Sequence, residues 1–202
     1  MLKRFFDLVF SAFGLLVISP FFLLIALLIK IDSAGPIFLR QVRVGKYLRL
    51  FRIHKFRTMV VNASDIGPSV TTDVDPRVTR IGKILRKYKI DELPQLIDVF
   101  LGDMSLVGPR PEVPKYVDAY SEMDKRVIFS VKPGITDKAS IEFRNENELI
   151  ENACDADRVY IEKILPCKLQ YYHEYVETRS LWLDIKIIFK TVWLILPFKS
   201  NK

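Results

Sequence analysis

A long run of apolar residues opens the chain, and residues 8–29 contain no charged side chain. At about 1.5 Å per residue, a helix of this length is long enough to cross a bilayer. The run exceeds the usual core of about 7–15 residues in a signal peptide, so we interpret it as a retained membrane segment. Basic residues flank it on both sides, with Lys3 and Arg4 before it and Lys30 after it. Because basic flanks favour the cytoplasmic side, this pattern favours both ends on one face.

Ser19 and Pro20 interrupt the apolar run near its middle. Proline removes one helical hydrogen bond and clashes with the preceding turn, at a cost of about 3 kcal/mol in a helix interior. The serine hydroxyl can bond a backbone carbonyl that the proline leaves free. We therefore expect residues 1–31 to enter the membrane, bend at Ser19-Pro20 and return to the same face as a re-entrant helix. The alternative is a kinked helix that spans the bilayer.

Two stretches after the turn at 32–36 alternate apolar and basic residues around Gly45 and Lys46, over residues 37–44 and 47–56. This alternation predicts a small β-hairpin with one packed face and one basic face. Such a basic face is most often only solvated, but beside a membrane segment it can equally meet lipid headgroups or phosphate.

Amphipathic helices are expected in three later segments, residues 77–88, 160–175 and 181–198. The first has basic residues three to four apart on one face and apolar residues opposite, as surface-lying membrane helices do. The last contains Trp182 and Trp193, which suit a membrane interface, and Asp184, which makes it a poor spanning helix. The alternative for this last segment is an ordinary core helix.

Composition limits the classes of function. The chain has 202 residues, of which half are hydrophobic and 27% charged, and its net charge is +7. This balance argues against a polytopic membrane protein and indicates an anionic partner. Two cysteines without a CxxC pattern and two distant histidines give neither a disulfide framework nor a zinc site.

Residues 89–96 carry the strongest chemical signal, because Asp91 and Glu92 place two adjacent carboxylates just before a helical pattern. That spacing predicts Asp91 as the N-cap of a helix and Glu92 as its first residue, with Pro94 tolerated in the first turn. Taken alone, the pair reads most simply as a capping aspartate beside a solvated glutamate.

A second signal is the Gly108-Pro109-Arg110-Pro111 loop. Its two prolines have fixed φ angles, so we expect them to hold Arg110 in one place. An arginine held in this way can contact phosphate oxygens with both arms of its guanidinium. The alternative is an ordinary turn with an exposed arginine.

Taken together, these segments resemble the bacterial sugar transferases that are monotopic phosphoglycosyl transferases. The resemblance covers nearly the whole chain, and its specificity lies in the order and spacing of several short blocks. These blocks are Lys3–Asp7, Ser19-Pro20, Gly35–Phe38, Lys55–Met59, Thr79–Gly82, Asp91–Leu96, Gly102–Pro111 and Lys132–Thr136. The shortness of the chain resembles the minimal catalytic unit of the family.

The resemblance implies transfer of a sugar 1-phosphate from a UDP-sugar to polyprenyl (undecaprenyl) phosphate, with release of UMP and a need for Mg²⁺. This reaction is the first membrane step of glycoconjugate synthesis. It implies Asp91 as a covalent nucleophile, with Glu92 either holding Mg²⁺ or accepting a proton, and it makes Asp91 and Glu92 the candidate metal ligands. Bringing two anionic substrates together requires cations, a role that Mg²⁺ and basic side chains can fill. The corresponding candidates are Lys55, Arg57, Arg110 and Arg144.

The chain departs from the family in one block. Many members follow Pro-Gly-Ile-Thr with Gly, a bulky residue, Ala-Gln and later a Gly-Arg pair, whereas residues 137–144 here read Asp-Lys-Ala-Ser-Ile-Glu-Phe-Arg. This difference bears on the sugar and on the role of Arg144. The sequence identifies neither the sugar nor the polyprenyl length, and it leaves open whether the chain forms a homodimer.

Two hypotheses from other classes remain beside the enzyme. A non-catalytic scaffold that binds anionic lipid at the membrane surface explains the charge and the helices, but not the Arg110 loop beside an acidic pair. A nucleic-acid binder has no recognised module here. The reading we adopt is a mainly helical α+β protein at the cytoplasmic face of the bacterial inner membrane. Its re-entrant membrane helix spans residues 1–31, and a compact catalytic domain with a small β-hairpin and interfacial helices spans 32–202.

Overall fold

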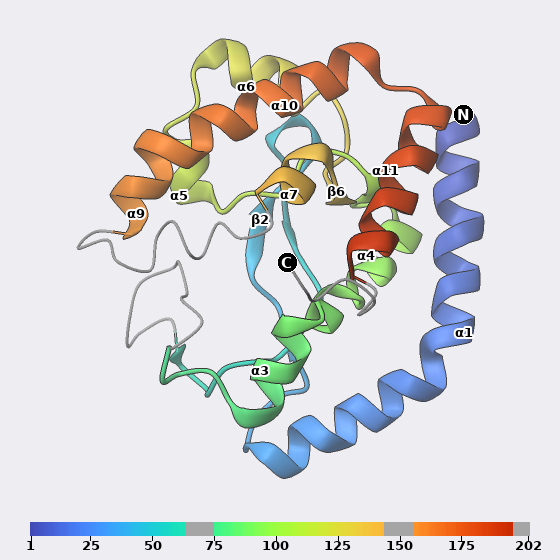
Figure 1. Cartoon of the computed structure of the whole chain (residues 1–202), viewed down its shortest axis with the longest axis vertical. Helices are drawn as coiled ribbons and strands as arrows, with labels where there is room; N and C mark the ends of the chain where they lie inside the picture. The colour runs from blue at the N-terminus through green and yellow to red at the C-terminus, as the bar shows by residue number, and fades with distance from the viewer. Residues whose placement is uncertain (64–74, 144–155, 196–202) are drawn as a thin grey trace.

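The computed structural model describes residues 1–63, 75–143 and 156–195. Its longest element is α1 (Leu2–Asp32), which Figure 1 shows as two arms joined by a bend along one side of the molecule. Pro20 lies inside this helix, and the Ser19 hydroxyl donates a hydrogen bond to the Leu16 carbonyl at 2.9 Å. That carbonyl is the one that Pro20 leaves without its helical partner, so the predicted compensation by Ser19 is confirmed. The helix is long and apolar enough to cross a membrane by length and composition.

Polar contacts fix the N-terminal end of α1 to the rest of the protein. The Lys3 ammonium donates to the Asp184 carboxylate at 2.5 Å and to the Val107 carbonyl at 3.1 Å. The Arg4 guanidinium donates to two carbonyls at the end of α4 (Gln95–Leu101). Asp7 is buried, and its carboxylate accepts bonds from the Ser105 hydroxyl and the Leu106 N–H. The charged residues before the apolar run therefore bind the folded domain.

The C-terminal end of α1 is fixed to the same domain. The Asp32 carboxylate accepts a hydrogen bond from the Ile81 N–H at 3.0 Å, in the first turn of α3 (Arg80–Lys87). Two buried isoleucines of α1 pack in one hydrophobic cluster with side chains from β4 (Lys55–Phe56) and α3, the members being Ile25, Ile29, Phe56 and Leu85. Both ends of α1 thus contact one folded body, although the helix is 31 residues long.

The predicted hairpin is confirmed. β1 (Phe38–Leu39) pairs with β4 and β2 (Val42–Val44) pairs with β3 (Leu50–Arg52), both antiparallel. Its turn is wider than the Gly45-Lys46 pattern predicts, because a 3₁₀ turn at Lys46–Leu48 separates the strands.

A second strand pair was missed by the sequence patterns. β5 (Ser105–Val107) and β6 (Gly134–Thr136) run parallel and pair with each other. The backbone at Gly134 lies very close to that at Gly108, since a Cβ atom at Gly134 would lie 2.1 Å from the Gly108 nitrogen. Two glycines make this contact sterically feasible, and the signal was hidden because each strand has only three residues.

Helices make up most of the remaining fold, as predicted. α3 begins at residue 80, later than the predicted 77, because the Thr79 hydroxyl caps it by accepting from the Gly82 N–H and Arg77 is bonded to Asp75. The other helical segments are α5 (Pro114–Val117), α6 (Glu122–Ile128), α7 (Lys138–Glu142), α9 (Ala156–Val159), the π-helical turn Tyr160–Ile164, α10 (Leu165–Thr178) and α11 (Leu181–Ile195). The largest buried cluster lies among the turns and helices from α5 to α10.

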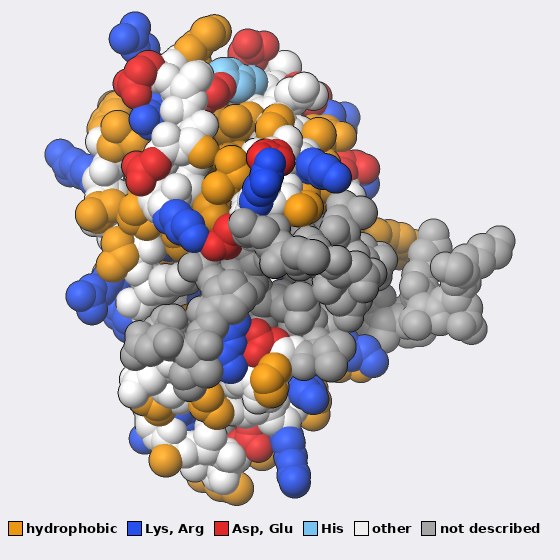
Figure 2. All heavy atoms as spheres, turned by 90° about the vertical axis from the view of Figure 1, so that its left-hand side faces the viewer, with side chains coloured by type: hydrophobic (Ala, Val, Ile, Leu, Met, Phe, Trp, Pro, Cys, Tyr) orange, Lys and Arg blue, Asp and Glu red, His pale blue; other side chains and the backbone are white. Residues whose placement is uncertain are grey.

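The two sides of the molecule differ in polarity. Large apolar side chains point outward along α1, among them Phe13, Leu16 and Leu23, each more than 60% exposed. α11 lies beside α1 in Figure 1 and exposes Trp182 and Trp193 while burying Asp184. Figure 2 shows the side away from α1, where Lys, Arg, Asp and Glu side chains are scattered among apolar ones.

Candidate active site

The acidic pair lies in a 3₁₀ turn, Ile90–Glu92, between α3 and α4. Lys89 precedes it with a left-handed backbone (φ 55°), a conformation that is uncommon for a non-glycine residue and often marks functional sites. Our prediction of Asp91 as a helix N-cap was wrong, because Pro94 occupies that position before α4 and no side chain caps this helix. The Asp91 carboxylate is therefore not used as a helix cap.

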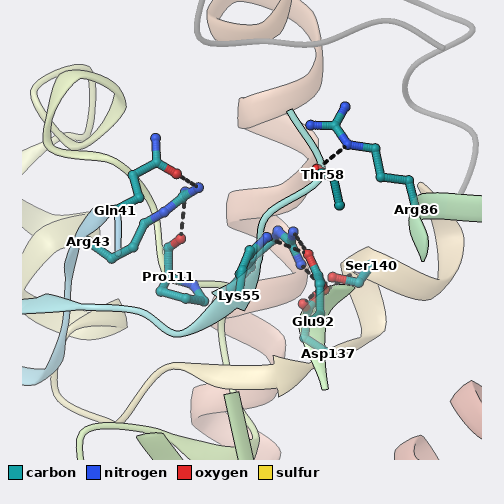
Figure 3. Close-up of polar contacts among 10 residues, drawn as sticks. Gln41, Arg43, Lys55, Thr58, Arg86, Glu92, Pro111, Asp137 and Ser140 are labelled. Carbon is teal, nitrogen blue, oxygen red and sulfur yellow. Dashed lines mark hydrogen bonds and ion pairs between the residues drawn. The ribbon is translucent and has the colours of Figure 1, made fainter. Parts of the chain in front are cut away.

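Glu92 lies between two cations (Figure 3). Its Oε1 accepts from the Lys55 ammonium at 2.7 Å and from the Arg110 guanidinium at 2.5 Å, and its Oε2 accepts from Arg110 at 3.2 Å. Burial alone would raise the pKa of Glu92, but the charges of Arg110 and Lys55 outweigh it and hold that pKa well below its usual value. Burial lowers the pKa of Lys55, which Glu92 partly restores. The glutamate is thus a paired, ionised group.

Asp91 has the opposite surroundings. Its Oδ1 atom is buried and has no hydrogen-bond partner among the residues that the structure describes. Burial, followed by the neighbouring charge of Glu92, raises the pKa of Asp91 above its ordinary value. A carboxylate oxygen that is shielded from water and bound to nothing is available to a ligand or to an electrophile.

The loop around Arg110 is held on both sides. The Pro109 carbonyl accepts from the Gly134 N–H at 2.9 Å, and the Pro111 carbonyl accepts from the Arg43 guanidinium at 3.0 Å. Beyond it, Glu112 is buried, its backbone carbonyl accepting from the Val44 N–H and its side chain from the Tyr160 hydroxyl. The two prolines predicted a rigid loop. In the structure, hydrogen bonds from Gly134 and Arg43 also hold the loop from outside.

The sequence-predicted residues do not all meet. Lys55, Glu92 and Arg110 come together, whereas Arg57 donates to the carbonyls of Ser33 and Ala34 at the end of α1. Arg144 lies outside the described residues. The pattern-based prediction missed Arg43 and Tyr160, because their contribution depends on which loop they bond rather than on a motif.

The C-terminal ends of the two parallel strands bring a further carboxylate near Arg110. Asp137 follows β6 as Arg110 follows β5, and loops at this edge of parallel strands commonly form ligand sites. The Asp137 side chain is buried and caps α7 by accepting from the Ser140 N–H at 2.9 Å. Burial raises the pKa of Asp137, against the attraction of Arg110 and Lys168. The residue that departs from the family pattern therefore lies in the wall of the site (Figure 3).

The donor groups fit a magnesium ion only in part. Among the described residues there is no group of three or more His, Cys, Asp or Glu side chains that could hold a metal. Magnesium, however, is usually held by one or two carboxylates together with substrate phosphates. Asp91 offers an unpaired oxygen, while Glu92 already binds two cations. Asp91 is thus the better placed of the two to hold the ion.

Comparisons with known proteins all place this chain among the bacterial sugar transferases. A sequence model described as "Bacterial sugar transferase" matches residues 1–197. A UDP-N-acetylgalactosamine-undecaprenyl-phosphate N-acetylgalactosaminephosphotransferase of Aeromonas hydrophila is 41% identical over 200 residues, which cover 96% of this chain and 44% of that protein. UDP-glucose:undecaprenyl-phosphate glucose-1-phosphate transferases of Escherichia coli and Caulobacter vibrioides are 39% and 38% identical. The matches cover 96% and 94% of this chain, and 40% and 68% of those relatives.

Proposed function

Because the chain belongs to the bacterial sugar transferase family, we propose that it transfers a sugar 1-phosphate from a UDP-sugar to undecaprenyl phosphate and releases UMP. This activity is the one for which relatives about 40% identical to the chain are named. Those two relatives are more than twice as long as the part that matches this chain. The proposal that this chain has the same activity therefore rests on the geometry of its site. The single observation that supports it most is an unpaired, buried Asp91 oxygen next to the Lys55–Glu92–Arg110 cluster.

The proposed reaction has two steps. A carboxylate oxygen of Asp91 bonds to the phosphorus that carries the sugar, and the bond from this phosphorus to the bridging oxygen breaks, so that UMP leaves with the electron pair. A phosphate oxygen of undecaprenyl phosphate then bonds to the phosphorus of this acyl phosphate and restores the Asp91 carboxylate. Raising the pKa of Asp91 makes its ionised form a stronger nucleophile.

Two cations prepare the site for anionic substrates. Lys55 and Arg110 neutralise Glu92, and the two cations together carry more positive charge than Glu92 cancels, which favours the binding of phosphate. When bound, Mg²⁺ would supply Lewis-acid stabilisation of phosphate charge. We propose that Asp91 holds this ion, with Glu92 taking part only if one of its two cations turns to the substrate instead.

The contacts of α1 support a re-entrant placement of this helix. Lys3 and Asp7 bind the domain at one end of the helix and Asp32 binds it at the other. A spanning helix would carry one of these ends across about 30 Å of hydrocarbon, away from its partners. We therefore propose residues 1–31 as a monotopic membrane element at the cytoplasmic face of the inner membrane, with residues 32–202 as the catalytic domain.

Single cysteines beside each end of α1 test this placement. In sealed inside-out vesicles, an impermeant thiol reagent should label both positions, and in right-side-out vesicles neither. Labelling of the two positions from opposite sides would refute re-entry. Pro20→Leu removes a helix-interior cost of about 3 kcal/mol and should shift some molecules toward spanning.

UMP release tests the function. The purified chain with Mg²⁺ and undecaprenyl phosphate should release UMP from at least one UDP-sugar in a panel of hexose and N-acetylhexosamine donors. The polyprenyl product should carry one sugar phosphate by mass spectrometry. No UMP with any donor, from protein that is folded and membrane-associated, would contradict the proposal and favour a lipid-binding scaffold.

A further inference from the structure

Gln95 is a buried polar residue that nothing above assigns to the reaction. It is the first residue of α4 and is only 2% exposed. Its Nε2 atom is buried and has no hydrogen-bond partner among the described residues. Leaving a buried amide unpaired costs about 1–3 kcal/mol, so such a group calls for a specific explanation.

The next turn of the same helix shows what a structural polar group looks like. Asp98 is 1% exposed, and both of its carboxylate oxygens are used by His54. Oδ2 accepts the His54 backbone N–H at 2.8 Å, and Oδ1 lies 2.6 Å from the His54 ring Nδ1. Within seven residues, α4 therefore contains a buried carboxylate with both oxygens bonded and a buried amide whose nitrogen has no partner among the described residues. Poor packing of the whole helix does not explain the difference.

Gln95 follows Asp91 by four residues. Leu93 and Pro94 both have right-handed helical backbone angles, so the 3₁₀ turn runs into α4 without a reversal. Residues four apart along such a path lie on the same face. The unpaired Oδ1 of Asp91 is an acceptor and the unpaired Nε2 of Gln95 is a donor, yet no hydrogen bond joins them.

These two atoms fit the two sides of one phosphoryl group. A phosphorus atom accepts an electron pair from the Asp91 carboxylate, while a non-bridging phosphoryl oxygen accepts a hydrogen bond from an N–H donor. We propose that the Gln95 side-chain amide donates to a non-bridging oxygen of the phosphoryl group that Asp91 attacks. This inference rests on the proposed function and adds a catalytic residue to it. No proton is transferred by Gln95, and the bonds made and broken are those of the Asp91 step.

The role follows from where charge develops. As the carboxylate approaches, negative charge accumulates around the phosphorus, and a fixed amide donor stabilises that state without reorganisation. Burial keeps the donor away from water and so strengthens this effect. The amide is hydrated in the unfolded chain and unpaired in the ligand-free fold, so its loss should cost rate rather than stability.

The test replaces Gln95 with Met, which is close in volume and needs no hydrogen-bond partner. Gln95→Met should lower kcat for UMP release by about 10²-fold, the usual effect of losing one such donor, with a much smaller change in KM. Its melting temperature should equal or exceed that of the unmodified protein. Gln95→Glu keeps the shape but places a carboxylate against the phosphate, and it should be at least as slow.

Tyr172→Phe is the matched control. The Tyr172 hydroxyl is also buried without a hydrogen-bond partner among the described residues, but it lies in the cluster around α10. Its removal should leave both kcat and stability nearly unchanged. Normal kcat in Gln95→Met, or a fall in its melting temperature well beyond that of Tyr172→Phe, would overturn the role of Gln95. Absence of UMP release from the unmodified protein would instead overturn the proposed function itself.

Discussion

The two sides of the acidic pair differ in almost every physical respect. On the Glu92 side, a carboxylate meets Lys55 and Arg110, and its pKa falls well below the usual value because their charges outweigh burial. On the Asp91 side, burial and the neighbouring negative charge raise the pKa, and one oxygen has no partner among the described residues. Adjacent carboxylates with opposed pKa directions are typical of sites that divide two roles between them.

This contrast distinguishes the roles of Asp91 and Glu92, which the sequence of residues 89–96 alone does not. Glu92 holds two cations in place, and in the proposed mechanism Asp91 is the reactive group. In this assignment Glu92 is a poor proton acceptor, because a carboxylate with a strongly lowered pKa resists protonation.

The largest effect should come from exchanging the reactive carboxylate. In single-turnover experiments with Mg²⁺ and UDP-sugar but no acceptor, the unmodified protein should release up to one UMP per enzyme and retain a phosphosugar on the Asp91 peptide. Asp91→Asn should abolish this burst and lower turnover by at least about 10⁴-fold, because the amide is not a nucleophile. Glu92→Gln should slow turnover but still allow the adduct. Substantial activity in the Asn variant would leave Asp91 at most a metal ligand.

Stability should respond mainly to the paired carboxylate. Glu92→Gln leaves the Lys55 and Arg110 charges without their anion, and loss of one partner from such a buried group costs about 3 kcal/mol. Urea unfolding measured at pH 7 should report this loss. Glu122→Gln is the control, because Glu122 is 85% exposed in its pair with Lys125 and should change stability very little. Equal effects of the two variants would contradict the structural role of Glu92.

A smaller change is expected at Arg110, which holds Glu92 and which we propose also contacts a substrate phosphate. Arg110→Lys keeps the charge but loses the two-armed contact that now reaches both oxygens of Glu92. We expect kcat/KM to fall about tenfold or more, equivalent to about 1.4 kcal/mol. The exposed Arg179, changed to Lys in the same way, should retain normal kinetics. Unchanged rates in Arg110→Lys would remove Arg110 from the site.

Sequence patterns were most informative where one local rule dominates. The apolar run, the bend with its Ser19 bond and the alternating hairpin each depend on neighbours in the chain. Of the site residues expected from short motifs and the family resemblance, the structure brings Lys55, Glu92 and Arg110 together. Patterns failed at Asp91, which lies inside a 3₁₀ turn, while Pro94 takes the N-cap position before α4.

Other features could not be predicted from the sequence because they depend on contacts between segments that are distant along the chain. The pairing of β5 with β6 joins residues about thirty positions apart and requires two glycines in contact. Arg57 is in a basic block that predicts phosphate binding, yet its guanidinium bonds the carbonyls at the end of α1. The unpaired amide of Gln95 has no sequence signal at all, because an unsatisfied group is recognised only once every neighbour is placed.

The smallest effect should be a gain in stability from Asp91→Asn, opposite in sign to Glu92→Gln. A folded-state pKa raised above the ordinary value of 3.8 means that the native protein binds this proton more tightly than the unfolded chain. The native state therefore loses stability relative to the unfolded chain as pH rises from about 3.8 through the raised pKa, and asparagine removes that loss. At pH 7 we expect a gain of about 1 kcal/mol, the usual size for relieving an unfavourable native group at a functional site.

The pH dependence makes this last prediction specific. The difference in unfolding free energy between Asp91→Asn and the unmodified protein should be near zero below pH 3.8, grow as pH rises and then level off. For Glu92 the sign reverses: its lowered pKa gives stability that is complete above about pH 4.5 and is lost as pH falls toward the folded-state value. Urea unfolding of both variants across this range decides the matter. A loss of stability in Asp91→Asn at pH 7 would mean that the Asp91 carboxylate is held by favourable contacts, and the division of roles between the two carboxylates would fail.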